Sequence, residues 1–319
     1  MRILYCGLKW NYGKKEEGYS YEWNNIEAGL RDVAQNGLCQ ALIYHPDEDD
    51  KLNVIDIIKL YKVDAVFHVA FNDTFDLPIE VANIALERNI PVIQFDCDSS
   101  WRFKDWILPR RNRVSHFVTT HNSTIPWYKS EGLKVIKSQW GCSPFYKPDF
   151  AAPKEYDVTF IGQKHGIRPQ IVEALRASQI NFRLFGQYWD GYPEWGGYLT
   201  SFDDMMKVFQ RSKINLNLSN PWHIGTLPQI KGRLFEIPAC GGFQLTTPAD
   251  DTESYYINNK EIVIANSLSD LTDKIKYYLE HEKEREEIAL AGYNRSMKDH
   301  TWNQRFHDIF QDIGLLNGQ

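Results

Sequence analysis

The sequence of 319 residues contains no run of about 18 consecutive apolar residues, which a helix needs in order to cross a membrane. We therefore expect no transmembrane helix. The first residues, MRILYCGLKWNYGKK, become polar too early for a secretory signal peptide, so a cytoplasmic protein is expected. The five cysteines form no Cys-x-x-Cys pair, and neither disulfides nor a structural zinc site is expected.

Several motifs of nucleotide and metal enzymes are also missing. No Gly-x-Gly-x-x-Gly is present, so a dinucleotide oxidoreductase has no support. The stretch from Gly7 to Lys15 is not a phosphate loop, because its spacing is one residue too long and Lys15 stands where Ser or Thr would hold Mg²⁺. His-Glu-x-x-His and Gly-x-Ser-x-Gly are absent as well. We expect no metal ion and no cofactor.

Positive charge is scarcer than negative charge, with 36 Lys and Arg against 42 Asp and Glu and a net charge of −6. This balance disfavours non-specific nucleic-acid binding, which depends on neutralising phosphates. The hydrophobic content of 43% is that of a globular protein, and the length suggests about two domains. Aromatic residues reach 14%, with ten Trp. They indicate either bulky cores or stacking platforms for sugars or bases.

Short apolar runs alternate with longer amphipathic ones, which predicts parallel sheets covered by helices. In the first half we expect strands at 2–6, 40–44, 64–69, 91–95, 116–120 and 134–138, and helices at 22–35, 52–61, 78–88 and 123–131. The proline-containing stretch 141–154 predicts a linker. After it we expect strands at 157–161, 182–185, 213–218, 243–246 and 261–265, and helices at 168–177, 203–210, 232–240, 270–280 (capped by Ser269), 284–298 and 304–313.

The sequence therefore predicts an α/β fold with two Rossmann-like domains in series. Ligands of open α/β sheets bind beyond the carboxyl ends of the strands, so we expect the two domains to face a cleft that holds the site. The first domain is expected over 1–150 and the second over 151–300. The last segment, 301–319, is expected to be a helix that packs back on the first domain.

The most informative block is KGRLFEIPACGG, residues 231–242. Lys231 and Arg233 stand at the start of a short helix, where cations oppose the helix dipole and where a diphosphate would explain them. Glu236, one turn further on, can accept hydrogen bonds from ribose hydroxyls. Gly241 and Gly242 permit a tight turn and a close approach of the backbone to a ligand. The alternative is a solvated helix with an exposed cationic start.

This block resembles the C-terminal domain of GT-B glycosyltransferases, particularly the spore-maturation-like subfamily with its Lys-x-Arg-x-Phe-Glu-x-x-Ala-x-Gly-Gly pattern. Residues 156–162, 182–189, 213–219 and 259–305 are similar to other strands and helices of that domain, and 95–101 and 140–148 match more loosely. The resemblance implies transfer of a sugar from a nucleotide-diphosphate donor, expected to be UDP-linked, to an acceptor hydroxyl without a metal ion. Of two glutamates common in retaining members, Glu236 matches the second. The first falls on Pro228, which leaves the stereochemistry open.

Further site residues are expected in the loops. The donor-binding residues are predicted to be Gly162, Arg168, Gly186, Asn217 and Ser219, together with Lys231, Arg233, Glu236, Gly241 and Gly242. Lys231 and Arg233 are also predicted to stabilise the leaving diphosphate, with Asp98 as the general base. The alternatives for the base are Asp96, Asp73 or a histidine such as His68. Acceptor binding is expected at Gly7, Tyr21 and Trp101. Structural alternatives stay open: a surface arginine at 168, a turn at 186, a mobile loop over 7–21, and a helix cap or ion pair at 98.

Two other functions remain open. One is a non-catalytic nucleotide-sugar-binding module, which would bind its ligand without turnover. The other is a sugar-nucleotide epimerase of the same architecture, which would release product without any acceptor. The sequence does not identify the acceptor, and it leaves glycans, small molecules, proteins and modified nucleobases open.

Overall fold

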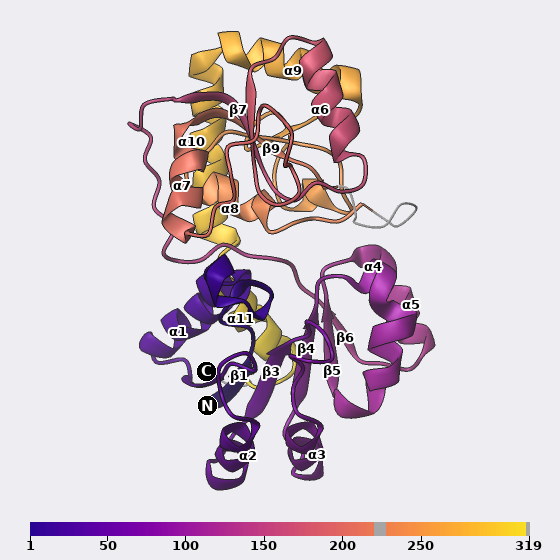
Figure 1. Cartoon of the computed structure of the whole chain (residues 1–319). Coiled ribbons are helices and arrows are strands. Elements are labelled where there is room, and N and C mark those ends of the chain that lie inside the picture. The colour runs from indigo at the N-terminus through magenta and orange to yellow at the C-terminus, as the bar shows by residue number, and fades with distance from the viewer. Residues whose placement is uncertain (220–227, 317–319) are drawn as a thin grey trace. The chain divides into compact units, whose positions relative to one another are not determined.

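The computed structural model describes residues 1–219 and 228–316, which form two compact units. Unit 1 combines Met1–Pro144 with Thr301–Gln319, and unit 2 is Phe145–His300 (Figure 1). Each unit holds a parallel sheet with helices packed on it, so the predicted α/β fold is confirmed. The units divide inside the predicted linker, six residues before the expected boundary at 150.

Six parallel strands form the sheet of unit 1 in the order β2-β1-β3-β4-β5-β6. Their bounds are β1 Arg2–Cys6, β2 Gln40–Tyr44, β3 Ala65–Val69, β4 Val92–Asp96, β5 His116–Thr119 and β6 Val135–Lys137. All six predicted strands are present, within one residue at either end. The chain order reverses between β1 and β3, which makes the carboxyl ends of these strands the expected ligand edge of the sheet.

The helices of unit 1 are α1 Ala28–Gln35, α2 Lys51–Leu60, α3 Ile79–Glu87, α4 Ser99–Arg102, α5 Ile125–Ser130 and α11 Trp302–Asp312. A π-helix, Glu22–Glu27, precedes α1. A second π-helix, Phe103–Ile107, and a 3-10 helix, Leu108–Arg113, continue α4. The sequence did not predict this stretch, because π and 3-10 turns depart from the 3.6-residue period of an α-helix. Short 3-10 turns cover Asn11–Gly13, Lys15–Glu17 and Asn122–Thr124.

Helix α11, from the end of the chain, packs against α1 in unit 1, and Figure 1 shows it in yellow among the indigo elements. Trp302, Phe306 and Phe310 are buried in the core that also contains strands β1, β3 and β4. Gly29 allows this contact, because a methyl group at that position would overlap the Cβ atom of Trp302. Residues 301–316 therefore complete the core of unit 1.

Unit 2 contains five parallel strands in the order β11-β10-β9-β7-β8. The strands are β7 Tyr156–Ile161, β8 Phe182–Phe185, β9 Ser212–Asn217, β10 Gln244–Thr246 and β11 Val263–Ile264. The helices are α6 Arg168–Ala177, α7 Phe202–Arg211, α8 Arg233–Ala239, α9 Leu268–Glu280 and α10 Glu282–Asp299, with a 3-10 turn at Thr252–Ser254. Ser267 caps α9, since its hydroxyl accepts from the Asp270 amide at 3.0 Å. The predicted cap at Ser269 is wrong.

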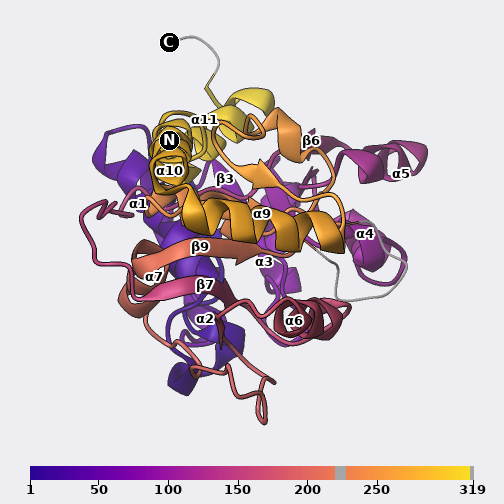
Figure 2. The same cartoon turned by 90° about the horizontal axis from the view of Figure 1, so that it is seen from above.

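The two faces of the second sheet differ in chemistry. One face is apolar and packs on α6 and α9, which lie beside each other in Figure 2. The other face contacts α7 and α8 and carries a set of buried polar side chains, namely Thr159, Asn215, Asn217, Gln244 and Thr246. Among the described residues, no helix is both long and apolar enough to cross a membrane.

The contact between α1 and α11 predicts that Gly29→Ala destabilises unit 1. The added methyl group must displace Trp302, which should lower the free energy of unfolding by about 1–3 kcal/mol. Urea unfolding followed by tryptophan fluorescence measures this change. Gln35→Ala, at an exposed position of the same helix, is the control and should stay within about 0.5 kcal/mol of wild type. An unchanged Gly29→Ala protein would show that the two helices do not pack in this way.

Candidate functional site

The carboxyl ends of β7 and β9 are the expected ligand edge of the second sheet, because the strand order reverses between them. Arg168 joins the loops that follow these two strands. Its guanidinium donates to the carbonyl of Gln163 at 2.7 Å and to that of Leu218 at 3.1 Å. The side chain is buried, and this burial, together with nearby Arg233, lowers the pKa of Arg168 to about 9. The predicted donor-side arginine is thus held rigidly at the ligand edge.

Lys231 and Arg233 lie at the start of α8, as predicted. Arg233 forms an ion pair with Glu236, whose side chain is buried. The second carboxylate oxygen of Glu236 accepts a hydrogen bond of 2.8 Å from the hydroxyl of Tyr146. Lys231 donates to the side-chain oxygen of Gln229. Both oxygens of the glutamate predicted to face a ribose therefore already have partners inside unit 2.

The sequence did not single out His165. The pKa of its imidazole depends on its burial and on the positive charge of this region. Burial, together with the positive charges of Arg168 and Lys231, lowers the pKa of His165 to about 3. The imidazole is therefore neutral near pH 7, and Arg168, Lys231 and Arg233 carry the charge around it. Glu236 balances one of these cations. The ligand edge of unit 2 thus carries excess positive charge, which suits an anion with more than one negative charge.

Glycines shape the two loops at this edge. Gly186 has φ of 127°, and a Cβ atom there would overlap the carbonyl oxygen of Gly162. The amide of Gly162 in turn donates to the carbonyl of Phe185 at 2.8 Å. Both predicted glycines therefore allow the loops after β7 and β8 to lie in contact.

Gly241 and Gly242 lie at the opposite edge, because they precede β10. Gly241 has φ of 75° and makes the predicted tight turn, with Phe150 against it. Gly242 lies against the side chains of Asn215 and Ile237. The atoms that lie against these two glycines belong to the protein, so both glycines have a packing role in the structure. The sequence pattern could not show at which edge of the sheet the two glycines lie, because that depends on the direction of the strands.

Asn217 and Ser219 end β9 but direct their polar atoms inward. The amide of Asn217 donates to the Thr246 hydroxyl at 3.1 Å. The hydroxyl of Ser219 bonds within the Thr247–Pro248 segment, with 2.6 Å to the Pro248 carbonyl. Beyond Pro248, a hollow of about 460 Å³ opens at the carboxyl ends of β10 and β11. Its lining is rich in hydroxyl and carboxylate oxygens, from Asp251, Thr252, Glu253 and Ser254.

The residues predicted for the acceptor lie in unit 1 with different exposures. Gly7 follows β1 and is packed against the ring of Tyr5. The hydroxyl of Tyr21 donates to the Gly141 carbonyl at 2.6 Å and accepts from the Trp302 indole at 3.2 Å, so it fastens the chain before the linker. Trp101, on α4, is 40% exposed. Of the three side chains, Trp101 offers the largest open surface.

A row of buried side chains crosses one face of the first sheet near its carboxyl edge. The sequence indicated Asp96 and His68 as alternative bases but did not predict that they share a row. Strand register places the row on adjacent strands, as Cys6, His68, Gln94, Asp96 and Thr119. Three of its polar atoms have no hydrogen-bond partner in the described part of the chain, namely His68 Nδ1, Gln94 Oε1 and Asp96 Oδ1. The polar residues at positions 94 and 96 of an otherwise apolar strand were the feature of the sequence that could have indicated this row.

Asp96 is fully buried and accepts a hydrogen bond from the Gln94 amide. Burial raises the pKa of Asp96 to about 7, although Arg102 and the Gln94 bond oppose the rise.

Asp98 differs from Asp96 in its burial and in its contacts. It is half-buried at the start of α4, its side chain does not cap the helix, and it has no ion pair with Arg102 or Lys104 among the described residues. Asp98 therefore has neither of the two structural roles considered for it, which were capping the helix and pairing with Arg102 or Lys104.

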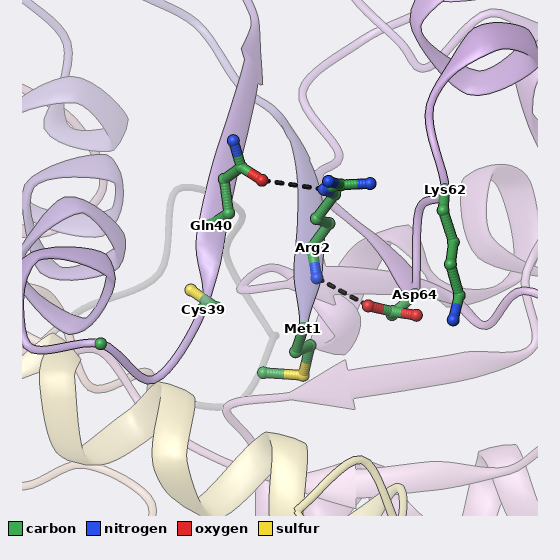
Figure 3. A pocket seen from close by; sticks show the side chains of 7 residues that line it. Met1, Arg2, Cys39, Gln40, Lys62 and Asp64 are labelled. Carbon is green, nitrogen blue, oxygen red and sulfur yellow. Dashed lines mark hydrogen bonds between the residues drawn. The ribbon is translucent and has the colours of Figure 1, made fainter.

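Another hollow, of about 470 Å³, lies at the amino ends of β1 and β2 (Figure 3). Arg2, Gln40 and Asp64 line it and are bonded to one another, at 2.8 Å from Arg2 Nε to Gln40 and 2.7 Å from the Arg2 amide to Asp64. This edge is opposite to the one where parallel sheets bind ligands. Over the described ranges, no group of three or more His, Cys, Asp or Glu side chains is placed to hold a metal ion.

Comparison with known proteins identifies the fold. Residues 168–311 match a family described as glycosyl transferase-like. No curated protein sequence matches the chain significantly. The GT-B fold that the sequence resemblance implied is confirmed by the solved structures that follow, whereas the spore-maturation-like subtype stays a prediction.

Three solved structures illustrate the likeness. HepE from Anabaena, in complex with UDP and glucose, has a TM-score of 0.64 at 10% identity, over 99% of this chain and 100% of HepE. Sucrose-phosphate synthase from Thermosynechococcus elongatus gives 0.63 at 9% identity, over 99% of each chain. AviGT4, a glycosyltransferase involved in avilamycin A biosynthesis, gives 0.64 at 11% identity, over 98% of this chain and 97% of its own. At such identities the likeness shows the fold alone.

The burial of Asp96 predicts a pH dependence of stability. A carboxyl group with a pKa near 7 in the folded state and near 3.8 when unfolded keeps its proton only in the folded state, so stability falls as the pH rises between these values. From pH 5 to pH 8 the loss is on the order of 2 kcal/mol. Asp96→Asn is neutral throughout and should lack this loss, so the unfolding free energy of the variant relative to wild type should rise from pH 5 to pH 8. Parallel urea-unfolding profiles for the two proteins would contradict the assignment.

Proposed function

We propose that this chain is a glycosyltransferase that takes a sugar from a UDP-linked donor and transfers it to an acceptor hydroxyl. The observation that carries the proposal is the group of Arg168, Lys231 and Arg233 around neutral His165, with one balancing carboxylate, at the ligand edge of unit 2. The family match over 168–311 and the UDP bound by HepE support the choice of a nucleotide sugar.

In this proposal the three cations bind the diphosphate and stabilise the charge that develops on it as the glycosidic bond breaks. Arg168 is already fixed by two carbonyl groups and Arg233 by Glu236, so little reorganisation is needed when the charge appears. Glu236 acts by orienting Arg233. Because the protein supplies the positive charge, we expect turnover to continue in the presence of a chelator.

Unit 1 supplies the acceptor side in this proposal. Asp98 is the general base that removes the proton of the acceptor hydroxyl, because its carboxylate is partly exposed and does not cap α4. Trp101, three residues further on and 40% exposed, provides a surface for the acceptor. Asp96 is fully buried, so its carboxyl group is not open to an acceptor hydroxyl and is less suited to this role.

The diphosphate assignment predicts that Lys231→Gln and Arg233→Gln each weaken UDP binding by roughly ten- to a hundredfold. A charge-assisted hydrogen bond is worth about 1.5–3 kcal/mol, and each substitution removes one donor of this kind. Isothermal titration calorimetry measures the affinity. Lys207→Gln, an exposed cation on α7, is the control and should bind UDP normally. Unchanged affinity in both site variants would move the diphosphate to another part of the chain.

The base assignment predicts that Asp98→Asn lowers kcat by about 10²–10⁴-fold while UDP affinity stays near wild type. Release of UDP from the donor, with added acceptors and a chelator present, gives the rate. Asp105→Asn, an exposed carboxylate of the same unit, is the matched control. A folded Asp98→Asn protein with normal kcat would exclude this base. UDP binding without any product would indicate a binding module, and an epimerised free donor would indicate an epimerase.

A further inference from the structure

Residues 99–137 of unit 1 differ in charge from the rest of the chain. They contain eight Lys and Arg against two Asp and Glu, whereas the whole chain has a net charge of −6. This segment comprises α4, the π and 3-10 helices after it, β5, α5 and β6. One part of an acidic protein is therefore strongly cationic.

Most of these cations form no hydrogen bond or ion pair with another described group of the protein. Arg102 binds the carbonyls of Ala70 and Phe71, and Arg110 pairs with two aspartates. Elsewhere in the chain surface cations commonly have acidic partners, as Lys213 has in Asp157. Five cations of the segment have no hydrogen-bonded or acidic partner among the described residues, and we call them the cationic strip: Lys104, Arg111, Arg113, Lys129 and Lys134.

The strip extends along the length of the helical layer. α4 starts at the carboxyl end of β4, and the chain runs back to Arg113 just before β5. α5 starts after β5 and leads to Lys134 just before β6. The helices α4 and α5 lie beside each other in Figure 1. The two helical stretches pack together through Phe103 and Tyr128, whose ring centroids are 4.9 Å apart. The strip thus reaches from the ligand edge of the first sheet towards its opposite edge.

Two tryptophans give the strip its apolar component. Trp101 is 40% exposed and Trp127 is 36% exposed, and the ring of Trp127 rests on Phe103 at 5.7 Å between centroids. The aliphatic side chains Ile107 and Val114 are buried. The surface therefore offers separated positive charges and two exposed aromatic rings, with little aliphatic area.

We infer that the cationic strip binds an anionic polysaccharide, which is the non-reacting part of a polymeric acceptor. Naming the polymer as acceptor rests on the proposed function, whereas its binding does not. Sugar rings can stack on Trp101 and Trp127, and carboxylate or phosphate groups of the chain meet the cations. Trp101 lies at the end of the strip nearest to Asp98, so the polymer is led towards the proposed base.

Other anionic partners fit less well. Duplex DNA carries a charge about every 1.7 Å, and a protein with a net charge of −6 repels so dense a polyanion. Stable binding to a membrane surface requires inserted apolar area, and the aliphatic side chains of the strip region are covered. A glycan with one carboxylate per sugar ring spaces its charges more widely than duplex DNA and matches five separated cations.

Binding is tested on the full-length protein by biolayer interferometry with immobilised alginate, a polyuronate, at low and at physiological salt. Neutral dextran, single-stranded oligo(dT) and phosphatidylserine vesicles are the comparison ligands. We expect alginate to bind best and its affinity to fall with salt. Replacing Lys104, Arg111, Lys129 and Lys134 together by Gln should weaken alginate binding at least about fivefold, as the loss of four exposed ion pairs implies.

The matched control replaces Lys59, Lys62, Lys260 and Lys276 by Gln, which changes the net charge equally at exposed positions outside the strip. It should keep wild-type affinity for alginate. An equal loss in the control, absence of alginate binding at low salt, or stronger binding of oligo(dT) or vesicles would each overturn the inference. UDP affinity should be unchanged in both variants, and a protein that binds alginate but not UDP would contradict the proposed function and leave the strip assignment standing.

Discussion

Excess positive charge at the carboxyl edge of the second sheet is the constraint on which the proposed chemistry depends. Burying an arginine costs free energy unless its donors are satisfied, and Arg168 meets this demand in part. Two backbone carbonyls accept from its terminal nitrogens, whereas its buried Nε has no hydrogen-bond partner among the described residues. Those carbonyls do not neutralise the guanidinium. Arg168 and Lys231, with the Arg233–Glu236 ion pair beside them, give this edge a positive charge that favours binding of a doubly charged anion. Burial and the same positive charges keep His165 in its neutral form.

Unit 1 places two aspartates two residues apart in contrasting surroundings. Asp96 belongs to the sheet interior, beside a hydroxyl network in which Ser99 contacts Thr119 at 3.0 Å and Tyr128 at 2.9 Å. Asp98 lies just outside it, where its carboxylate is partly exposed. Burial raises the pKa of Asp96 to about 7, so this carboxyl group can hold a proton at a pH well above the usual range of an aspartate. The interior network fixes the start of α4, on which Asp98 and Trp101 depend for their position.

The sequence predicted the strands well because a short apolar run between two amphipathic helices has the length and composition of a buried parallel strand. It failed where geometry departs from regular periods, as in the π and 3-10 turns between Phe103 and Arg113. The sequence also could not show which residues form contacts when they are far apart in the chain. The bond between Tyr146 and Glu236 joins residues 90 positions apart, and His165 is a lone histidine in a loop. Gly241 and Gly242 were linked to a ligand because a motif does not reveal at which edge of the sheet it lies.

Hydrogen–deuterium exchange with and without UDP tests the central claim most directly, because it locates the ligand independently of any substitution. We expect UDP to slow exchange of backbone amides in 162–168 and 229–236, which hold Arg168, Lys231 and Arg233 at one edge of the sheet. Amides of 241–243, at the other edge, should exchange at their unliganded rates. Protection confined to 241–243 or to unit 1, or no protection at a saturating UDP concentration, would contradict the account.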